Sequence, residues 1–139
     1  MPLPNADYSR LASFRYALRR FLHFSEAEAA RAGLSGQQYQ ALLALRATPE
    51  GERMTISDLA RQLLVRHHSA VGLVDRLVEQ GLMRRKTIVE DRRKVELRLT
   101  TKGRLVLAML AAVHRAELRR AGRVIGRLMA EINSRREDG

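Results

Sequence analysis

The sequence contains no cysteine and few aromatic residues, which make up 4% of its 139 residues. Without cysteine, the chain cannot form disulfides, thiolate nucleophiles, zinc–cysteine sites or thiol-based redox sensors. With so few aromatic side chains, it offers little surface on which the bases of single-stranded nucleic acid could stack. These two shortages exclude several classes of function before any motif is considered.

Several motifs and all long apolar segments are also missing. The sequence has no glycine-rich phosphate loop, no His-Glu-x-x-His motif and no nucleophile elbow, so we expect no enzymatic activity and no cofactor. No apolar run approaches the roughly 20 residues that span a bilayer, and the first residues lack the apolar region of a signal peptide. We therefore expect a cytoplasmic, nucleoid-associated protein that does not contact a membrane, folded as one unit over residues 1–139.

Positive charge is what the sequence has in excess. The formal net charge is +11 and the sequence pI is about 11.4. The segment 84–104 holds nine Lys or Arg residues against three Asp or Glu residues, so more than half of the net charge lies there. Six of these charges flank a strand-like run and repel one another, which favours a polyanionic partner such as nucleic acid. A solvated surface hairpin is the alternative.

Hydrophobic periodicity and capping signals predict a mainly helical (α+β) chain with one pair of strands. We expect helices over residues 8–32, 35–48, 55–63, 66–80, 101–120 and 123–135, and strands over residues 82–88 and 95–99 joined by a charged turn. Ser35 with Gln38, and Thr55 with Asp58, form capping boxes that open the second and third helices. Gly81 is expected to end the helix over 66–80.

The helix over residues 66–80 has two different faces. Its apolar positions recur at helical spacing and are expected to face the core: Ala70, Leu73, Val74 and Leu77. Ser69, Gly72 and Arg76 lie on the opposite side, where small and basic residues allow close approach to a partner. Short helices followed by a basic hairpin predict a winged helix-turn-helix, in which the second helix enters a major groove and the wing lies against phosphates.

Two stretches resemble the MarR family of bacterial transcriptional regulators. They are LVDRLVEQGLMRR, residues 73–85, and the wing sequence DRRKVELRLTTKG, residues 91–103. The resemblance covers nearly the whole chain. It implies an obligate homodimer that reads a palindromic operator in double-stranded DNA, as a repressor that a small-molecule effector releases. We place the winged helix-turn-helix lobe at residues 35–99 and the helical dimerisation lobe at residues 1–34 and 100–139.

The resemblance also implies roles for individual residues. Arg93 is expected to reach into a minor groove from the wing. Asp75, Asp91 and Arg93 are expected to take part in an ion-pair network that braces the recognition helix and the wing. The candidate DNA-contacting residues are Thr55, Ser57, Arg66, His67, His68, Ser69, Gly72, Arg76, Arg92, Arg93 and Lys94.

Partners other than DNA can also be considered from the sequence. The terminal helices carry more apolar surface than the central unit could cover, so a partner subunit is expected. Family members commonly bind small aromatic or phenolic anions, and the candidates to line such a pocket are Phe14, Phe21, His23, Tyr39 and His67. His114 and Glu117 stand three residues apart on a helix, but we expect no metal site. The alternative function is a basic interaction module that binds RNA or an acidic protein.

Overall fold

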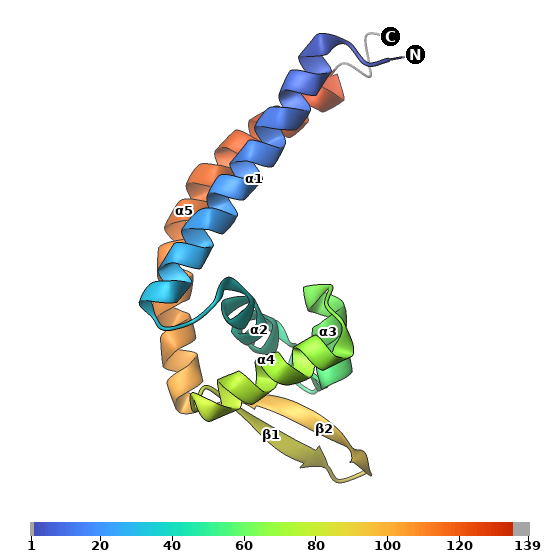
Figure 1. Cartoon of the computed structure of the whole chain (residues 1–139), viewed down its shortest axis with the longest axis vertical. Coiled ribbons are helices and arrows are strands. Elements are labelled where there is room, and N and C mark those ends of the chain that lie inside the picture. The colour runs from blue at the N-terminus through green and yellow to red at the C-terminus, as the bar shows by residue number, and fades with distance from the viewer. Residues whose placement is uncertain (1, 135–139) are drawn as a thin grey trace. The chain divides into compact units, whose positions relative to one another are not determined.

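The computed structural model describes residues 2–134. Its elements are α1 (Asn5–Arg31), α2 (Gly36–Ala47), α3 (Ile56–Leu63), α4 (His67–Glu79), β1 (Met83–Ile88), β2 (Asp91–Leu99) and α5 (Thr101–Ser134) (Figure 1). The predicted mainly helical fold with a two-stranded sheet is confirmed. The chain divides into two compact units: residues 1–28 with 112–139, called here the helical unit, and residues 29–111, called the winged unit. The predicted lobe at 35–99 lies within the winged unit, which extends beyond it at both ends.

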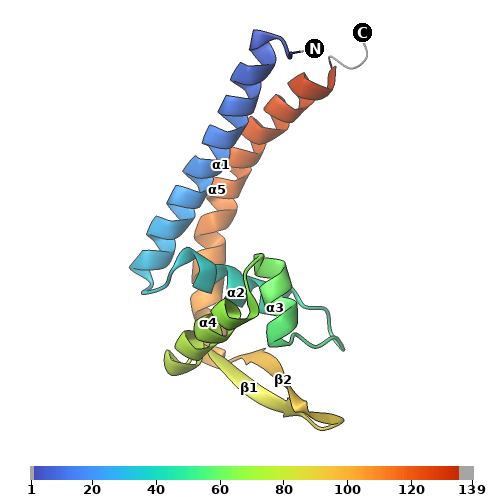
Figure 2. The ribbon, with the colours of Figure 1, turned by 45° about the vertical axis from the view of Figure 1, so that its right-hand side comes forward.

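In the helical unit, α1 runs antiparallel to the second part of α5, and the two helices lie side by side in both ribbon views (Figures 1 and 2). His114 of α5 is buried between them. A ring nitrogen of His114 lies 2.8 Å from the Ser25 hydroxyl oxygen, and the rings of Phe21 and Phe24 meet the imidazole edge-on. A second polar contact joins the same two helices, an ion pair between Arg10 Nε on α1 and a Glu131 carboxylate oxygen on α5 at 3.5 Å.

The prediction of two C-terminal helices was wrong, because α5 is continuous from Thr101 to Ser134. The expected break lay near Gly122, where the chain has neither a proline nor a capping side chain. A single glycine inside a helix costs only about 1 kcal/mol. The inward positions His114, Ala121 and Leu128 keep the helical period across it, so packing against α1 outweighs that cost. No helix within residues 2–134 is long and apolar enough to cross a membrane.

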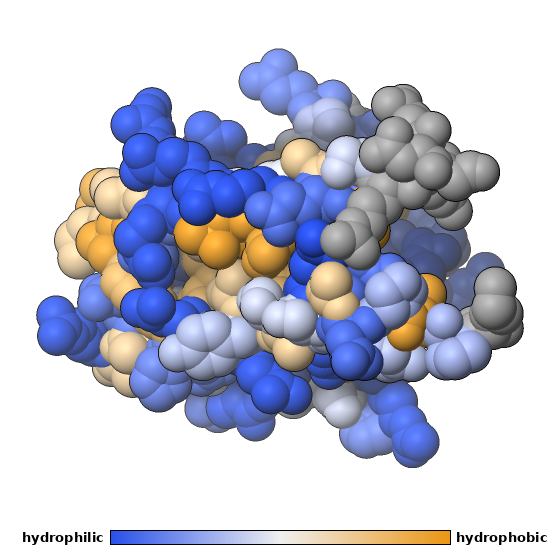
Figure 3. Space-filling model, turned by 90° about the horizontal axis from the view of Figure 1, so that it is seen from above, coloured by the Kyte–Doolittle hydropathy of each residue, from blue (hydrophilic) through white to orange (hydrophobic). Residues whose placement is uncertain are grey.

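Exposed apolar side chains remain on both helices of the helical unit. They are Leu3, Tyr8, Leu11, Tyr16, Leu18 and Leu22 near or on α1, and Val113, Leu118, Val124, Met129 and Ile132 on α5. Tyr16 is 63% exposed and Leu118 is 57% exposed. Seen from above, apolar residues form an area bordered by hydrophilic ones (Figure 3). So many large apolar side chains in water are unusual for a surface that meets only solvent.

The winged unit has a core built from every one of its elements. Its fully buried large side chains are Leu42, Leu59, Val74, Leu77 and Met83. Both predicted capping boxes are confirmed. The side chains of Ser35 and Thr55 accept hydrogen bonds from the backbone N–H groups of Gln38 and Asp58, and the side chains of Gln38 and Asp58 accept from the backbone N–H groups of Ser35 and Thr55. The first turns of α2 and α3 thus have partners for their free N–H groups, which fixes where each helix begins.

Strands β1 and β2 form an antiparallel ribbon that extends away from helices α2 to α4 (Figure 2). The chain enters β1 through Gly81, whose positive φ of 74° follows the end of α4. The second strand begins at Asp91, four residues earlier than predicted, and only Val89 and Glu90 form the turn. The prediction that Arg92–Lys94 belong to the turn was therefore wrong. The register shifts between Thr87, which pairs with Val95, and Ile88, which pairs with Asp91, so that Arg92, Arg93 and Lys94 lie at an irregularity of the ladder, between these two pairs.

Candidate nucleic-acid interface

Helices α3 and α4 are joined by a tight turn that orients the second helix. Leu64 adopts the left-handed conformation with φ 56° and ψ 42°, and its N–H bonds to the carbonyls of Ala60 and Arg61. Arg66 then stands at the N-cap of α4 in an extended conformation. Leu64 is 92% exposed, so its position is set by the backbone turn and not by burial of its side chain.

The two faces of α4 are separated as the sequence predicted. The four predicted inward positions, Ala70, Leu73, Val74 and Leu77, are all buried. On the other side, Ser69 and Arg76 are exposed and Gly72 is half-buried. Arg66, His67 and His68 are exposed at the N-terminal end of the same helix. The free face thus offers hydrogen-bond donors and small side chains, with the helix held from behind by the core.

The wing displays its basic side chains to solvent. Arg84, Arg85 and Lys86 on β1, and Arg92, Arg93 and Lys94 on β2, are all exposed. Each strand also has buried side chains, which are Met83 and Ile88 on β1 and Leu97 on β2. Arg84, Arg85 and Lys86 are paired with β2 in the ladder, whereas Arg92, Arg93 and Lys94 lie at its irregular part, next to the Ile88–Asp91 pair.

Asp75 on α4 forms an ion pair with Arg85 on β1, which joins this helix to the wing. Asp91 accepts hydrogen bonds from the backbone N–H and the Nε of Arg93, at 3.1 and 3.3 Å. The side chain of Arg93 remains 92% exposed. The three residues expected to brace the wing therefore take part in two separate pairs, and Arg85 was missed as a member.

A second ion pair holds the tip of the wing, and the sequence reasoning missed it entirely. The two terminal nitrogens of Arg53 donate to the two carboxylate oxygens of Glu90 at 2.9 and 3.1 Å. The Arg53 guanidinium lowers the pKa of Glu90, and the carboxylate in turn raises the pKa of Arg53. Nearby, the Leu97 N–H donates to the Met54 carbonyl at 2.8 Å. The segment before α3 is thereby attached to the wing at two points.

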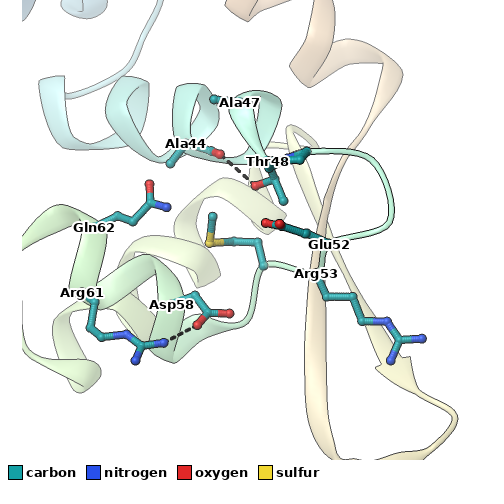
Figure 4. Close-up of a pocket in the computed structure, with 10 residues that line it drawn as sticks. Ala44, Ala47, Thr48, Glu52, Arg53, Asp58, Arg61 and Gln62 are labelled. Carbon is teal, nitrogen blue, oxygen red and sulfur yellow. Dashed lines mark hydrogen bonds and ion pairs between the residues drawn. The ribbon is translucent and has the colours of Figure 1, made fainter.

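Arg53 also belongs to a hollow of about 330 Å³ between the end of α2, the following loop and α3. Figure 4 shows the Arg53 guanidinium pointing away from this hollow, while Asp58 and Arg61 form an ion pair across its other side. The Thr48 hydroxyl donates to the Ala44 carbonyl at 3.0 Å.

A cleft of about 430 Å³ lies between the start of α3, the start of α4 and strand β2. It brings together candidate DNA-contacting residues from three separate segments: Thr55, Ser57, His67, Arg93 and Lys94. The Ser57 Oγ lies 3.5 Å from the Nδ1 of His67. We call this the α3–wing cleft. The candidates Arg66, His68, Ser69, Gly72, Arg76 and Arg92 do not line it.

The residues expected to bind an effector occupy several different environments. Tyr39 is 6% exposed in the core of the winged unit, where burial raises the pKa of its hydroxyl. His67 lines the α3–wing cleft. His23 lines a separate hollow of about 970 Å³ in the helical unit, together with Tyr16, Arg19, Arg20, Phe24, Ala27, Glu117 and Arg120. Phe14 and Phe21 are half-buried on α1 and are not among the residues that line it.

The histidine and carboxylate considered for a metal site have other partners. His114 contacts Ser25, and Glu117 accepts hydrogen bonds from Arg120, which lower the pKa of the carboxyl. Among residues 2–134, no group of three or more His, Asp or Glu side chains is placed to hold a metal ion. What remains as a candidate site is the basic surface of the winged unit.

A helix-turn-helix whose second helix has a free polar face, followed by a two-stranded basic ribbon, defines a winged helix-turn-helix protein. A sequence model of the MarR family matches residues 32–94. The transcriptional activatory protein BadR of Rhodopseudomonas palustris is 33% identical over 112 residues, which are 80% of this chain and 62% of BadR. The HTH-type transcriptional repressor YetL of Bacillus subtilis is 29% identical over 96 residues, 69% of this chain and 57% of YetL.

Solved structures show the same fold over most of the chain. AbsC, a MarR family transcriptional regulator from Streptomyces coelicolor, has a TM-score of 0.76 at 26% identity, over 87% of this chain and 81% of AbsC. Sco3205, a MarR family regulator from the same organism solved in complex with DNA, has a TM-score of 0.76 at 22% identity, over 96% of this chain and 89% of its own. By sequence and by fold, the chain is similar to transcriptional regulators of the MarR family. It spans about three fifths of the length of the two curated relatives.

Proposed function

We propose that this protein is a transcriptional regulator that binds double-stranded DNA in a sequence-specific manner. The observation that carries this proposal is the pairing of a free helix face on α4 with a basic wing, both fixed to one rigid core. The Asp75–Arg85 ion pair joins these two elements directly. The description of Sco3205 in complex with DNA supports the same function for a protein of this fold.

Each part of the surface suits a different part of the duplex. Arg66 and Arg76 on α4 carry guanidinium groups that can form two hydrogen bonds with guanine in a major groove. The half-buried Gly72, with no bulky side chain, allows the helix to approach closely. The wing arginines contact phosphates, and the exposed Arg93 enters the neighbouring minor groove. Thr55 and Ser57 at the start of α3 add hydroxyl donors for the backbone.

A homodimer is the form in which this protein is expected to bind. The exposed apolar side chains of α1 and α5 in the helical unit, among them Leu22 and Leu118, need a cover that residues 2–134 do not supply. A second copy related by a two-fold axis supplies that cover, and it places two α4 helices in successive major grooves of a palindromic site. An interface of this kind is expected to bury more than roughly 2,000 Å².

An effector is expected to act on the helical unit. The hollow that contains His23 is lined by Arg19 and Arg20 together with aromatic rings, while its third arginine, Arg120, is paired with Glu117. This excess of positive charge beside aromatic rings suits a small aromatic or phenolic anion. We propose that the protein acts as a repressor at the nucleoid and that such a ligand releases it from DNA. Among its relatives, YetL is described as a repressor and BadR as an activator.

The test is selection of bound duplexes from a random-sequence library, followed by competition. The regulator is expected to enrich a palindrome with half-sites about one helical turn apart, and bulk RNA is expected to compete poorly at physiological salt. Enrichment of no sequence, with RNA competing as well as DNA, would instead favour the basic interaction module.

A further inference from the structure

We propose that the α3–wing cleft binds a phosphate of the DNA backbone and that His67 binds it as the imidazolium, so that DNA binding takes up a proton. This inference rests on the proposed DNA-binding function and adds a regulation to it. It predicts that the same protein holds DNA more tightly as the pH falls from 8 towards 6.

The Ser57 hydroxyl and the His67 ring lie side by side in the cleft, where a phosphate oxygen can reach both. Ser57 Oγ and His67 Nδ1 are 3.5 Å apart, both on exposed side chains. This distance is at the outer limit for a hydrogen bond, so the two groups do not satisfy each other fully. A phosphate oxygen in the cleft can accept a bond from the hydroxyl and another from the protonated ring. The neutral ring has a single N–H, whereas the imidazolium donates from both nitrogens.

Most charged residues around His67 are positive, so a positive charge on its ring would need an anion from outside the protein. Arg93 and Lys94 of β2, together with Arg61 of α3, line the same cleft. Arg66 and His68 flank His67 in the chain, and His67 begins α4, where the helix dipole is positive. The surroundings of His67 are therefore strongly positive.

Asp58 is the one carboxylate among the residues that line the cleft within the described chain. The Thr55 N–H and hydroxyl and the Arg61 guanidinium bond to it and lower its pKa. Because Asp58 is already the cap partner of α3, it is committed to other groups. A phosphate is thus the ligand that compensates a positive charge on His67, and it comes from the DNA.

The number of protons taken up determines how strongly DNA affinity depends on pH, and the number of phosphate contacts determines how strongly it depends on salt. Histidine changes its charge between pH 5 and 8, while DNA phosphates stay ionised throughout that range. If one proton is taken up per subunit, affinity changes by at most about tenfold per pH unit for each subunit. We expect roughly three- to tenfold tighter binding per subunit at pH 6 than at pH 8. Each new charge–phosphate contact also steepens the salt dependence, by about 0.9 in the logarithmic slope.

Two opposite substitutions test this with a matched pair of variants. His67→Gln introduces a polar side chain that carries no charge, and His67→Lys introduces one that is charged throughout the range from pH 6 to 8. Binding is measured by fluorescence anisotropy between pH 6 and 8, each at several salt concentrations. The probe is a labelled mixed-sequence duplex of about 30 base pairs, long enough for two half-sites. Circular dichroism at each pH confirms that the variants are folded.

The proposal predicts a distinct pattern for each protein. The wild type should bind more tightly and show a steeper salt dependence at low pH. The glutamine variant should lose most of the pH dependence and keep the shallower slope, whereas the lysine variant should lose the pH dependence and keep the steeper slope. His68→Gln, whatever it does to affinity, should retain the wild-type pH dependence, because His68 does not line the cleft.

Two results would overturn the proposal while leaving DNA binding intact. One is wild-type affinity that does not change between pH 6 and 8, and the other is a glutamine variant with the full wild-type pH dependence. Failure of the wild type to bind any duplex at any pH is different, because it would refute the proposed function itself.

Discussion

Gly103, near the start of α5, is the position at which a single methyl group should do the most damage. A Cβ built there would lie 2.9 Å from the carbonyl carbon of Leu82 and closer still to its oxygen. Backbone atoms at that distance must move. They are held in place, because the Thr100 hydroxyl donates to the Gly81 carbonyl at 2.6 Å and Lys102 donates to the Gln80 carbonyl at 3.0 Å.

Gly103→Ala therefore sets two effects against each other. Alanine is favoured over glycine inside a helix by about 1 kcal/mol, whereas overpacking against a fixed backbone costs about 1–3 kcal/mol and occasionally more. We expect the clash to win, with a net loss of roughly 1–2 kcal/mol in the free energy of unfolding. The contact joins α5 to the link between α4 and β1, so the loss should appear in the unfolding of the winged unit.

Gly126→Ala in the same helix is the matched control. Within residues 2–134, leaving aside its chain neighbours and its own helix backbone, no atom lies within 4 Å of a Cβ built at Gly126. Only the helix preference then remains, and stability should rise by up to about 1 kcal/mol. Urea denaturation followed by circular dichroism, at one fixed protein concentration, compares the two variants. If Gly103→Ala stabilises the protein as much as Gly126→Ala does, the close approach of α5 to Leu82 is refuted.

Three further predictions concern the core, the Asp75–Arg85 ion pair and the exposed face of α4. Leu110→Asp should unfold the winged unit, because Leu110 is 5% exposed and an unpaired buried carboxylate costs several kcal/mol; Met109→Asp, at a side chain 67% exposed, should leave circular dichroism unchanged. We also expect Met109→Asp to split the dimer, which sedimentation would detect as a smaller species. Asp75→Ala should weaken DNA binding by releasing Arg85, and unchanged affinity in anisotropy would remove this ion pair from the mechanism. Arg76→Ala should cost about 1–3 kcal/mol and relax preference at one operator position; equal weakening on all sequences would make it a phosphate contact.

Local signals in the sequence were enough to predict most of the elements. The capping boxes at Ser35 and Thr55 predicted where two helices begin, because such caps depend on residues three apart. The apolar spacing in α4 predicted which face is buried, and the alternation around Leu97 predicted a strand. These features depend on residues that are close in the sequence, so the residue pattern alone is enough to predict them.

Contacts between distant segments could not be predicted in the same way. Arg53 and Glu90 are 37 residues apart, and nothing in an exposed arginine or glutamate indicates its partner. The α3–wing cleft likewise exists only because Ser57, His67 and Lys94 are brought together by the fold. The early start of β2 depends on an irregular register at Thr87 and Ile88, which alternation alone does not reveal.

The salt dependence of DNA binding by wing variants shows whether the basic side chains of the wing contact DNA phosphates. The wing presents Arg92, Arg93 and Lys94 as exposed charges, and each phosphate contact contributes about 0.9 to the logarithmic salt slope. Changing Arg92 and Lys94 to alanine removes up to four charges from a dimer, so the slope should fall by about 2–4. Arg93→Ala should instead reduce the preference for A·T-rich flanks, because a narrow minor groove attracts a guanidinium. A triple-alanine wing that binds with the wild-type slope and the wild-type flank preference would contradict the account.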